Sequence, residues 1–360
     1  MQQFNNIYQG KKVFLTGHTG FKGSWLSLWL EQLGAVVGGF SQWEPVSTPC
    51  HVSLLTPPAH DFRGDVREFD KLNFAVQRFA PEIVFHLAAQ PLVRKSYGDP
   101  LETFSTNILG TANLLRACCD IPSVKAVVVI TTDKVYENRE WSWGYRETDT
   151  LGGHDPYAAS KACAELVVNS FRKSFYETEG KLTASCRAGN VIGGGDWAHD
   201  RIVPDMVRAT AKGETTIIRM PNAVRPWEHV LEPLAGYLLV GQRLLEGKAE
   251  FAQAWNFGPD TEGIVTVAQL VELAKTHWNA LKIDLDRLTG QPLHETSYLS
   301  LDCSKAKHRL GWLPVWSLAE TVRHTIDWYR EYYENNKVAT LEQLSQFVAD
   351  AQKRKVIWTN

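Results

Sequence analysis

The segment KVFLTGHTGFKGSWLSLWLEQL, residues 12–33, decides the fold. Its pattern indicates a short apolar strand, a loop with glycine at every third position, and an amphipathic helix over residues 24–33. A dinucleotide-binding loop requires this order of elements. Gly17 permits the tight turn, Gly20 lets the backbone approach a pyrophosphate, and Gly23 allows close packing of helix on strand. The free N–H groups at the helix start would then face the anion.

The glycine spacing is G-x-x-G-x-x-G rather than G-x-G-x-x-G, so a glycine-rich turn without a ligand is the alternative. The flanking strand and helix favour the dinucleotide loop. The residues of this loop that we predict to contact a cofactor are Gly17, Thr19, Gly20, Phe21, Lys22 and Gly23.

Strands and helices alternate along the first half of the chain. Alternation of this kind predicts an α/β protein with a Rossmann-type, doubly wound parallel sheet. After residue 193 the pattern changes to polar and aromatic loops, such as 225–229 and 255–258. We therefore expect a dinucleotide-binding domain over residues 1–192, to which some later segments can return, and a smaller mixed α/β lobe mainly over residues 193–360. The predicted strands are 35–40, 60–63, 82–87, 127–130 and 183–188, and the predicted helices are 68–79, 106–119, 157–180, 267–281, 318–333 and 341–351.

Several strand ends carry candidate cofactor contacts. The second strand runs into Ser41 with neither a carboxylate for a ribose nor an arginine for a 2′-phosphate, which favours NAD over NADP. Asp65, followed by Val66, can accept from an adenine amino group or cap the next helix, and both alternatives stay open. The residues Leu87, Ala88 and Ala89 would let a cofactor approach the backbone. Asn107 is expected to hold nearby main chain with its amide.

A second pattern concerns catalysis. Tyr157 and Lys161 stand four residues apart at a helix start, so they share a face, and they follow a buried apolar strand whose end carries polar groups. A cationic Lys161 favours the phenolate and lowers the pKa of Tyr157. The pair can then take a proton from an alcohol while hydride leaves the same carbon. An exposed helix face is the alternative.

Composition restricts the partners. The net charge is −2 with 22% charged residues, which gives no electrostatic case for nucleic acid or an anionic membrane. The six cysteines lack metal-ligand spacing, so we predict no metal site and reduced thiols in a cytoplasmic protein. The N-terminus has no apolar signal core, and no window is long enough to span a membrane.

Taken together, the glycine loop, Asp65-Val66, His86-Leu87-Ala88-Ala89, Asn107 in T-N-x-x-G-T and the Tyr157–Lys161 pair resemble the extended short-chain dehydrogenase/reductase superfamily. These motifs follow the order of that superfamily over nearly the whole chain. The resemblance implies a Rossmann domain that binds NAD and a smaller lobe that binds a nucleotide-sugar. It also implies a homodimer or homotetramer that pairs through the helices containing Asn107 and Tyr157.

Thr132-Asp133 before Val135-Tyr136 is similar to the nucleotide-sugar 4,6-dehydratases. Relatives acting on dTDP-glucose usually follow this aspartate with glutamate, whereas Lys134 resembles the branch acting on CDP-glucose. The stretches 187–197 and 301–306 resemble that branch too. The resemblance implies a lyase that dehydrates CDP-glucose to CDP-4-dehydro-6-deoxyglucose in deoxysugar biosynthesis, of the kind that serves O-antigen lipopolysaccharide, and regenerates NAD.

The resemblance also assigns catalytic roles. Tyr157, supported by Lys161, would take the proton of the 4-hydroxyl while Thr132 holds the same oxygen. Asp133 would be the acid, and Lys134 stands at the position of the base, where it would need a neutral amine.

The expected substrate-binding residues are His86, Gln90, Thr132, Asn190, Arg201 and Arg225. Arg201 and Arg225 would meet phosphates through the guanidinium fork, with a surface arginine as the alternative. His86 has the alternative of a satisfied core histidine.

Two rival functions remain. A nucleotide-sugar 4-epimerase shares Tyr157, Lys161 and NAD, but needs no acid–base pair such as Asp133-Lys134. A non-catalytic NAD-sensing interaction protein on the same fold would not need to keep both Tyr157 and Lys161.

Overall fold

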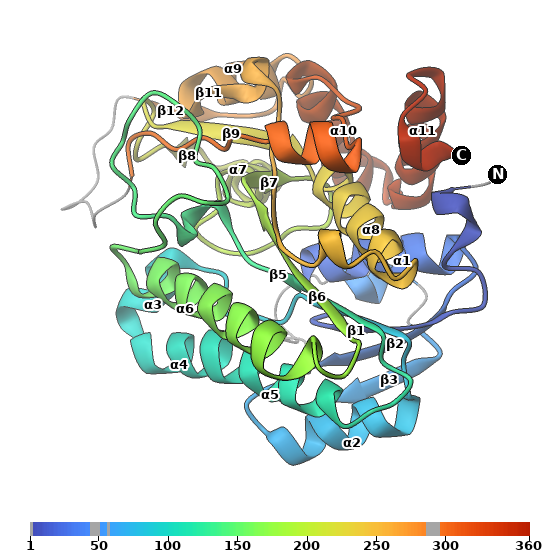
Figure 1. The fold of residues 1–360 in the computed structure, drawn as a ribbon. Coiled ribbons are helices and arrows are strands. Elements are labelled where there is room, and N and C mark those ends of the chain that lie inside the picture. The colour runs from blue at the N-terminus through green and yellow to red at the C-terminus, as the bar shows by residue number, and fades with distance from the viewer. Residues whose placement is uncertain (1–2, 44–50, 56–57, 286–295) are drawn as a thin grey trace.

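The computed structural model describes residues 3–43, 51–55, 58–285 and 296–360, and Cys50 lies outside them. A seven-stranded parallel sheet forms its centre, in the order β10-β6-β5-β4-β1-β2-β3 (Figure 1). Strand order reverses at β1, which pairs with β2 on one side and β4 on the other, and this reversal is where such sheets bind ligands. The strands are β1 (Lys12–Thr16), β2 (Val36–Ser41), β3 (His60–Arg63), β4 (Ile83–His86), β5 (Ala126–Ile130), β6 (Leu182–Ala188) and β10 (Ala254–Phe257).

Helices cover both faces of this sheet, as Figure 1 shows. Side chains alternate between the faces along each strand. Phe14 of β1 therefore joins the core under α2 (Phe69–Phe79), α5 (Gly110–Cys119) and α6 (Pro156–Phe171). Its neighbours Val13 and Leu15 join the core under α1 (Phe21–Gln32) and α8 (Leu231–Leu245). Because both faces are buried, a central strand such as β5 is continuously apolar, which made it predictable.

The predicted helices and strands of the first half are present with shifted ends. Helix α1 begins at Phe21, three residues before the predicted start, because Gly20 is the extended N-cap residue (φ −72°, ψ 169°). The predicted helix 157–180 is shorter: α6 ends at Phe171 and continues as a π-helical turn, Arg172–Tyr176. A second π-helical turn, Ser105–Leu109, precedes α5.

The loops predicted at 225–229 and 255–258 are wrong, because both segments are strands. The first lies in β9 (Val224–His229), which pairs in parallel with β7 (Asn190–Ile192) and antiparallel with β11 (Ile264–Thr266). The second lies in β10, which returns to the main sheet beside β6. Polar residues such as Glu228 hid the strand pattern of β9, although they are buried.

The remaining elements form a second lobe, which begins directly after β6. A two-stranded sheet pairs β8 (Thr216–Ile217) with β12 (Ile283–Asp284). The helices of this lobe are α7 (Ile202–Ala211), α9 (Val267–Lys275), α10 (Leu318–Asn335) and α11 (Thr340–Lys353). The last two confirm the predicted helices 318–333 and 341–351.

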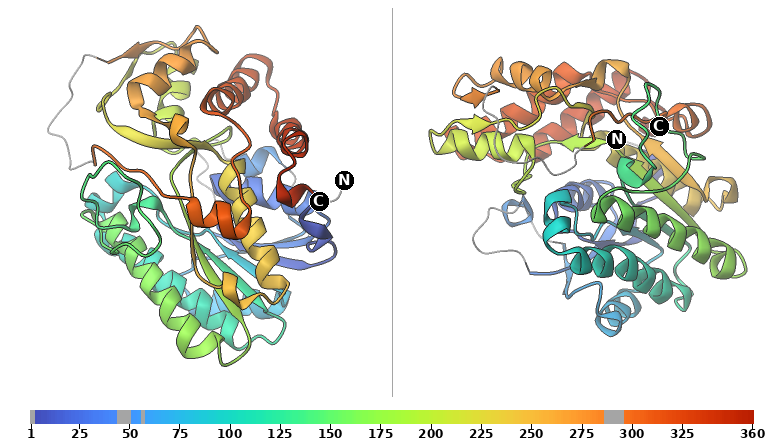
Figure 2. Two further views of the ribbon diagram at one scale, coloured as in Figure 1. Left: turned by 45° about the horizontal axis from the view of Figure 1, so that its top comes forward. Right: turned by 90° about the vertical axis from the view of Figure 1, so that its left-hand side faces the viewer.

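The two ends of the chain meet. The Asn5 amide donates to the Asn360 carbonyl at 3.0 Å, and both views of Figure 2 place the termini together. Near them, His51 joins Ser24 of α1 to Thr340 of α11, with both ring nitrogens 2.7 Å from a hydroxyl oxygen. Among the described helices, none has the length and apolarity to cross a membrane.

Candidate active site

The glycine loop packs so closely on the end of β4 that side chains are excluded. Gly17 has φ +73°, and a Cβ there would lie 2.7 Å from the Ala88 nitrogen. A Cβ on Gly23 would lie 2.0 Å from the Gly17 carbonyl oxygen. The N–H groups of the first turn of α1 have no partners within the helix, so they are available to an anion. The close packing and the free N–H groups suit the pyrophosphate of a dinucleotide.

Ser41 fixes the glycine loop rather than standing free at the end of β2. Its hydroxyl lies 2.9 Å from Nδ1 of His18, and it accepts from the Thr19 amide at 3.4 Å. Nε2 of His18 lies 3.0 Å from Oδ1 of Asp61. Sequence reasoning missed His18, which fills the space over Gly39, where a Cβ would lie 2.3 Å from its ring.

Asp65 does not cap α2, whose N-cap residue is Glu68. It accepts instead from the Arg67 amide at 2.8 Å and from the Gln42 amide group at 2.6 Å. Burial raises the pKa of Asp65, but the hydrogen bonds and charge of Arg67 outweigh it and hold this pKa below its ordinary value. The next residue, Val66, is buried.

An arginine does lie beside the end of β2. The residues that directly follow this strand include none, so we had expected no arginine there. The arginine is Arg63, supplied by the neighbouring strand β3. Its guanidinium donates to the Gln42 carbonyl at 3.1 Å and lies 5.0 Å from the Trp43 ring centre. Sequence proximity alone could not show this, because β3 pairs with β2 only in the folded sheet.

Asn107 holds main chain, as expected. Its amide donates to the Gln90 carbonyl at 3.1 Å and to Ser160 Oγ at 2.8 Å, and its oxygen accepts from the Gln90 amide at 2.8 Å. The loop after β4 is further tied down by the Leu87 amide, which donates to the Thr16 carbonyl at 3.1 Å. Ala88 and Ala89 follow in this loop and are half-buried.

The polar side-chain atoms of His86 and Gln90 are occupied by residues of the fold, although the charge of Lys161 acts on His86. Nδ1 of His86 lies 2.6 Å from Thr16 Oγ1 and its Nε2 lies 3.1 Å from Thr111 Oγ1, so both nitrogens are used in the core. Burial lowers the pKa of His86 to about 3. The side-chain amide of Gln90 donates to Thr103 Oγ1 at 2.9 Å. The core alternative for His86 therefore fits better than substrate contact.

Thr132, Asp133 and Lys134 form a tight cluster at the end of β5. The Thr132 hydroxyl donates to Asp133 Oδ1 at 2.9 Å, and Lys134 Nζ lies 3.2 Å from the same oxygen. The Asp133 side chain is 1% exposed. Its other oxygen, Oδ2, has no hydrogen-bond partner among the described residues. The cluster thus presents one buried acceptor that nothing in the described chain satisfies.

Tyr157 and Lys161 lie beside this cluster, but the expected lowering of the phenol's pKa does not occur. Burial raises the pKa of Tyr157 to about 12 and outweighs the lowering effect of a hydrogen bond with Thr132. Lys161 Nζ donates to the Ile130 carbonyl at 3.1 Å. Burial and the nearby charge of Lys22 lower the pKa of Lys161 to about 8.

A buried ion pair supports the floor of the site. Arg187 of β6 and Glu165 of α6 lie 2.9 Å apart, and Glu165 also accepts from the Thr131 hydroxyl at 2.5 Å. These bonds fix the end of β5 against α6, which carries Tyr157 and Lys161. The reacting groups are therefore held by rigid elements.

The substrate candidates Asn190, Arg201 and Arg225 come from the chain after β6. Oδ1 of Asn190 is buried without a hydrogen-bond partner among the described residues. Arg201 Nη1 lies 2.8 Å from Asp196 Oδ2, with 32% of the arginine side chain exposed. Arg225 is 8% exposed and donates to the Val224 carbonyl at 2.9 Å. Neither arginine is a free surface residue.

Comparison with known proteins places the chain in a family. Residues 14–325 match the model of the GDP-mannose 4,6-dehydratase family. The chain belongs to this family. The predicted resemblance to the extended short-chain dehydrogenases is thereby confirmed, as is the predicted fold class.

Relatives within and around the GDP-mannose 4,6-dehydratase family fit this assignment. A CDP-glucose 4,6-dehydratase from Salmonella typhimurium is 49% identical over 96% of this chain and 98% of its own. A dTDP-glucose 4,6-dehydratase from Xanthomonas campestris is 24% identical over 74% and 78% of the two chains. A UDP-glucose 4-epimerase from Thermotoga maritima, solved with UDP-glucose, superposes with a TM-score of 0.75 at 25% identity and covers 89% of this chain and 99% of its own.

Two further charged residues of this family member belong to the site, one of them unexpectedly. Lys22, predicted from the glycine loop as a cofactor contact, lies with its Nζ 3.4 Å from Tyr237 Oη. Burial lowers the pKa of Lys22 to about 8. Glu228 of β9 was not predicted at all. The available signal was a carboxylate within an apolar and aromatic run, next to Trp227.

No group of three potential metal ligands gathers within the described segments of the chain.

Proposed function

We propose that the chain is a NAD-dependent hydro-lyase that converts CDP-glucose to CDP-4-dehydro-6-deoxyglucose in deoxysugar biosynthesis of the O-antigen type. One structural observation carries the proposal: the Thr132–Asp133 cluster, whose buried Oδ2 is unsatisfied among the described residues, lies beside Tyr157 and Lys161. The Salmonella typhimurium CDP-glucose 4,6-dehydratase supports the choice of substrate, because it is 49% identical over nearly the full length of both chains.

The residues suit a reaction that begins at C4. A proton at C5 of glucose is too weakly acidic to remove directly, whereas a ketone at C4 makes it an α-proton. When bound, NAD supplies a temporary acceptor for the C4 hydride, which is later returned to C6. Tyr157 takes the proton of the 4-hydroxyl, and Thr132 holds the same oxygen. Lys161 stabilises the resulting phenolate by its positive charge.

The elimination step uses the carboxyl group of Asp133. It gives its proton to the departing C6 hydroxyl, and its side chain is 1% exposed, so bulk water is kept away from it. Lys134 could act as the C5 base only as a neutral amine. Its Nζ instead donates to Asp133 Oδ1 at 3.2 Å, so we propose that Lys134 acts by holding Asp133 in place.

The two domains would hold different ligands. Residues 1–192 would hold NAD, and residues 193–360 would mainly hold the nucleotide-sugar, with Arg201 and Arg225 at its phosphates and Asn190 near the sugar. The residues proposed to hold NAD are Gly17, Thr19, Gly20, Phe21, Lys22, Gly23, Ser41, Asp65, Val66, Leu87, Ala88, Ala89, Asn107, Tyr157 and Lys161.

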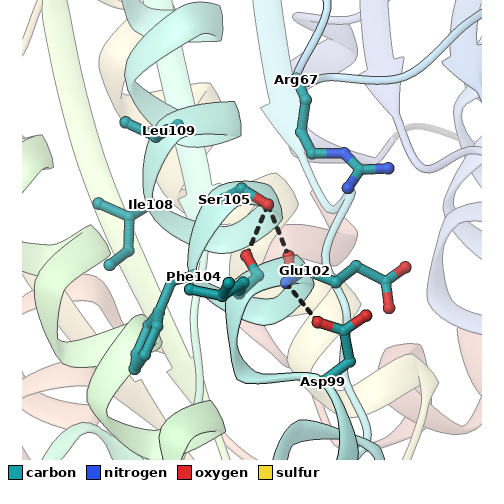
Figure 3. A pocket seen from close by; sticks show the side chains of 8 residues that line it. Arg67, Asp99, Glu102, Phe104, Ser105, Ile108 and Leu109 are labelled. Carbon is teal, nitrogen blue, oxygen red and sulfur yellow. Dashed lines mark hydrogen bonds between the residues drawn. The ribbon is translucent and has the colours of Figure 1, made fainter.

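The chain is proposed to assemble as a homodimer or homotetramer through α5, α6 and α4 (Pro100–Phe104). Exposed leucines mark these helices: Leu101 is 78% exposed, Leu109 59% and Leu166 58%. A hollow of about 830 Å³ runs along this face. In Figure 3 the side chains of Phe104, Ile108 and Leu109 lie on one side of the helical segment, and those of Arg67 and Glu102 lie on the other. An apolar patch with a charged rim suits a second copy of the chain.

The cytoplasm is the proposed compartment. The five cysteines in the described segments of the chain are all free, and four of them, Cys118, Cys119, Cys186 and Cys303, are buried. Free buried thiols suit a reducing environment.

Proton NMR of the purified protein with NAD and separate CDP-, dTDP-, GDP- and UDP-linked hexoses tests the function. A new C6 methyl signal with CDP-glucose alone is the expected result, and deuterium placed at C4 should appear in that methyl group. A methyl signal with another nucleotide would keep the dehydratase and discard the cytidine assignment. A sugar inverted at C4 would indicate a 4-epimerase. Stabilisation by NAD without turnover would indicate an NAD-sensing protein.

A further inference from the structure

Glu228 is a buried carboxylate whose oxygens are left unsatisfied. It lies in β9 with 2% of its surface exposed. Neither of its oxygens is satisfied by a close hydrogen bond within the described residues; the Gly189 backbone N–H lies near enough to lower its pKa, but burial outweighs this effect. An unpaired carboxylate inside a protein is costly, so it needs a functional explanation.

Glu232, four residues further along the chain in α8, is a buried carboxylate with a structural role. It is equally buried, but its two oxygens accept from the Val315 amide at 2.9 Å and the Trp316 amide at 2.8 Å. Those bonds fasten the start of the C-terminal segment to α8. Glu228 fastens nothing of this kind among the described residues.

The surroundings of Glu228 belong to the active site. Strand β9 pairs with β7, which puts Glu228 opposite Val191 on the chain that leaves β6. The charges of Lys22 and Asp133 both act on Glu228 through space. Lys22 is influenced in turn by Glu228, Arg201, Asp133 and Lys134. The charge of Asp133 thus reaches Glu228, and each of the two carboxyl groups has an acceptor oxygen that is unsatisfied among the described residues.

We propose that Glu228 is the base that removes the C5 proton of the nucleotide-sugar, and that Lys22 is the positioning residue that keeps Glu228 directed at the substrate. This inference rests on the proposed dehydratase function. In the step, the C5–H bond breaks and its proton goes to a Glu228 oxygen. The electron pair forms the C5–C6 double bond as the C6–O bond breaks. Asp133 protonates the departing hydroxyl, which leaves as water.

The electrostatics of Glu228 suit this task. Burial raises its pKa to about 8, against the opposing effect of Lys22. A base is most effective when its pKa lies close to the working pH, and a higher pKa makes it a stronger proton acceptor. The elimination rate should therefore rise as pH approaches 8. The groups that face Glu228 are Lys22 of α1, Asp133 after β5, the Gly189 amide, Glu232 and Tyr237 of α8, and Cys303.

Glu228→Gln tests the proposal, because it keeps the shape and removes the base. Formation of the C6 methyl group should fall by about 10²- to 10⁴-fold. Oxidation at C4, followed by absorbance of the reduced nicotinamide, should continue. Exchange of the C5 proton with deuterated solvent, measured in recovered sugar, should be lost. The comparison variant Asp133→Asn lacks the acid but keeps the base, so it should still exchange C5.

A second variant separates catalysis from charge balance. If Glu228 merely neutralises Lys22, the double substitution Lys22→Met with Glu228→Leu should restore elimination, and that result would overturn the proposal. We expect the ratio of elimination to C4 oxidation in the double variant to stay as low as in Glu228→Gln; the ratio is compared because Lys22 is also a proposed NAD contact, so its loss can slow both steps. Glu232→Gln is the matched buried control. It should lower the melting temperature but leave the ratio of elimination to C4 oxidation unchanged.

The wild-type protein in the same assay keeps the two proposals apart. Wild-type protein that forms no methyl group would overturn the dehydratase function and this inference with it. Wild-type turnover together with a Glu228→Gln variant of normal elimination rate would overturn the role of Glu228 alone.

Discussion

Lys134 and Asp133 are adjacent in sequence and are also joined through their side chains, with Nζ 3.2 Å from Oδ1. The carboxylate is 1% exposed, whereas the lysine side chain is 26% exposed. The partly exposed Lys134 side chain thus holds the buried Asp133 side chain. This contact distinguishes a positioning role for Lys134 from the role of a neutral base.

Substitution of Lys134 separates these two roles. Lys134→Arg keeps a cation that can pair with Asp133, so we expect C6 methyl formation within about 10-fold of wild type. Lys134→Met removes the cation and should cost more, about 10²-fold. Equal loss in both variants, measured by NMR, would instead mean that Lys134 takes the C5 proton itself.

The raised pKa of Tyr157 predicts a pH dependence for C4 oxidation. Because this pKa is about 12, the reactive phenolate is the minor form at neutral pH. While the pH stays below this pKa, the phenolate fraction grows about tenfold for each unit by which the pH rises. The rate of C4 oxidation in a single turnover should therefore rise from about pH 7 to about pH 10. Tyr157→Phe should be slower by about 10²-fold or more and should lose this rise. A flat profile in the wild type would contradict the role of the phenolate.

His51 predicts a loss of stability in acid. Burial lowers its pKa to about 3, from an ordinary value of 6.5. Between these two values the unfolded chain binds a proton that the folded chain does not. The stabilisation is therefore present above the ordinary pKa and is lost as pH falls toward the folded one, by about 1.4 kcal/mol per pH unit. Urea titrations from about pH 7 to about pH 4 should show a shallower slope in His51→Gln. An unchanged slope would mean that His51 is already charged in the folded protein.

The exposed leucines predict a self-association surface. Leu109→Glu puts a charge into the apolar patch on α4 and α5, and should raise the dissociation constant of the assembly roughly 100-fold. Sedimentation velocity measures this change. Leu313→Glu is the matched control, because Leu313 is 49% exposed elsewhere on the chain and should leave association unaffected. If both variants keep the wild-type mass, this face does not form the interface.

The first half of the fold could be predicted because its signals are local. The glycine loop and the apolar runs of β1, β4 and β5 specify their elements without help from distant residues. The buried polar strand β9 could not be predicted in this way. Its residues Arg225 and Glu228 are buried only because β7 and β11 flank them.

The site shows the same contrast between local and long-range signals. Tyr157, Lys161 and Asp133 stand in short motifs that sequence alone displays. The surroundings that tune them come from far away in the chain. Lys22 of α1 acts on Lys161 of α6, and the raised pKa of Tyr157 depends on burial, which no spacing rule supplies.

The late return of β10 to the main sheet has a consequence for how the protein is made. The edge of β6 is paired only when Ala254–Phe257 arrives, and the adjoining face of the sheet is covered only when α8 is in place. A ribosome must therefore release the chain beyond residue 257 before the sheet can close. Until then the nascent chain carries an open strand edge, the kind of surface on which a chaperone would act.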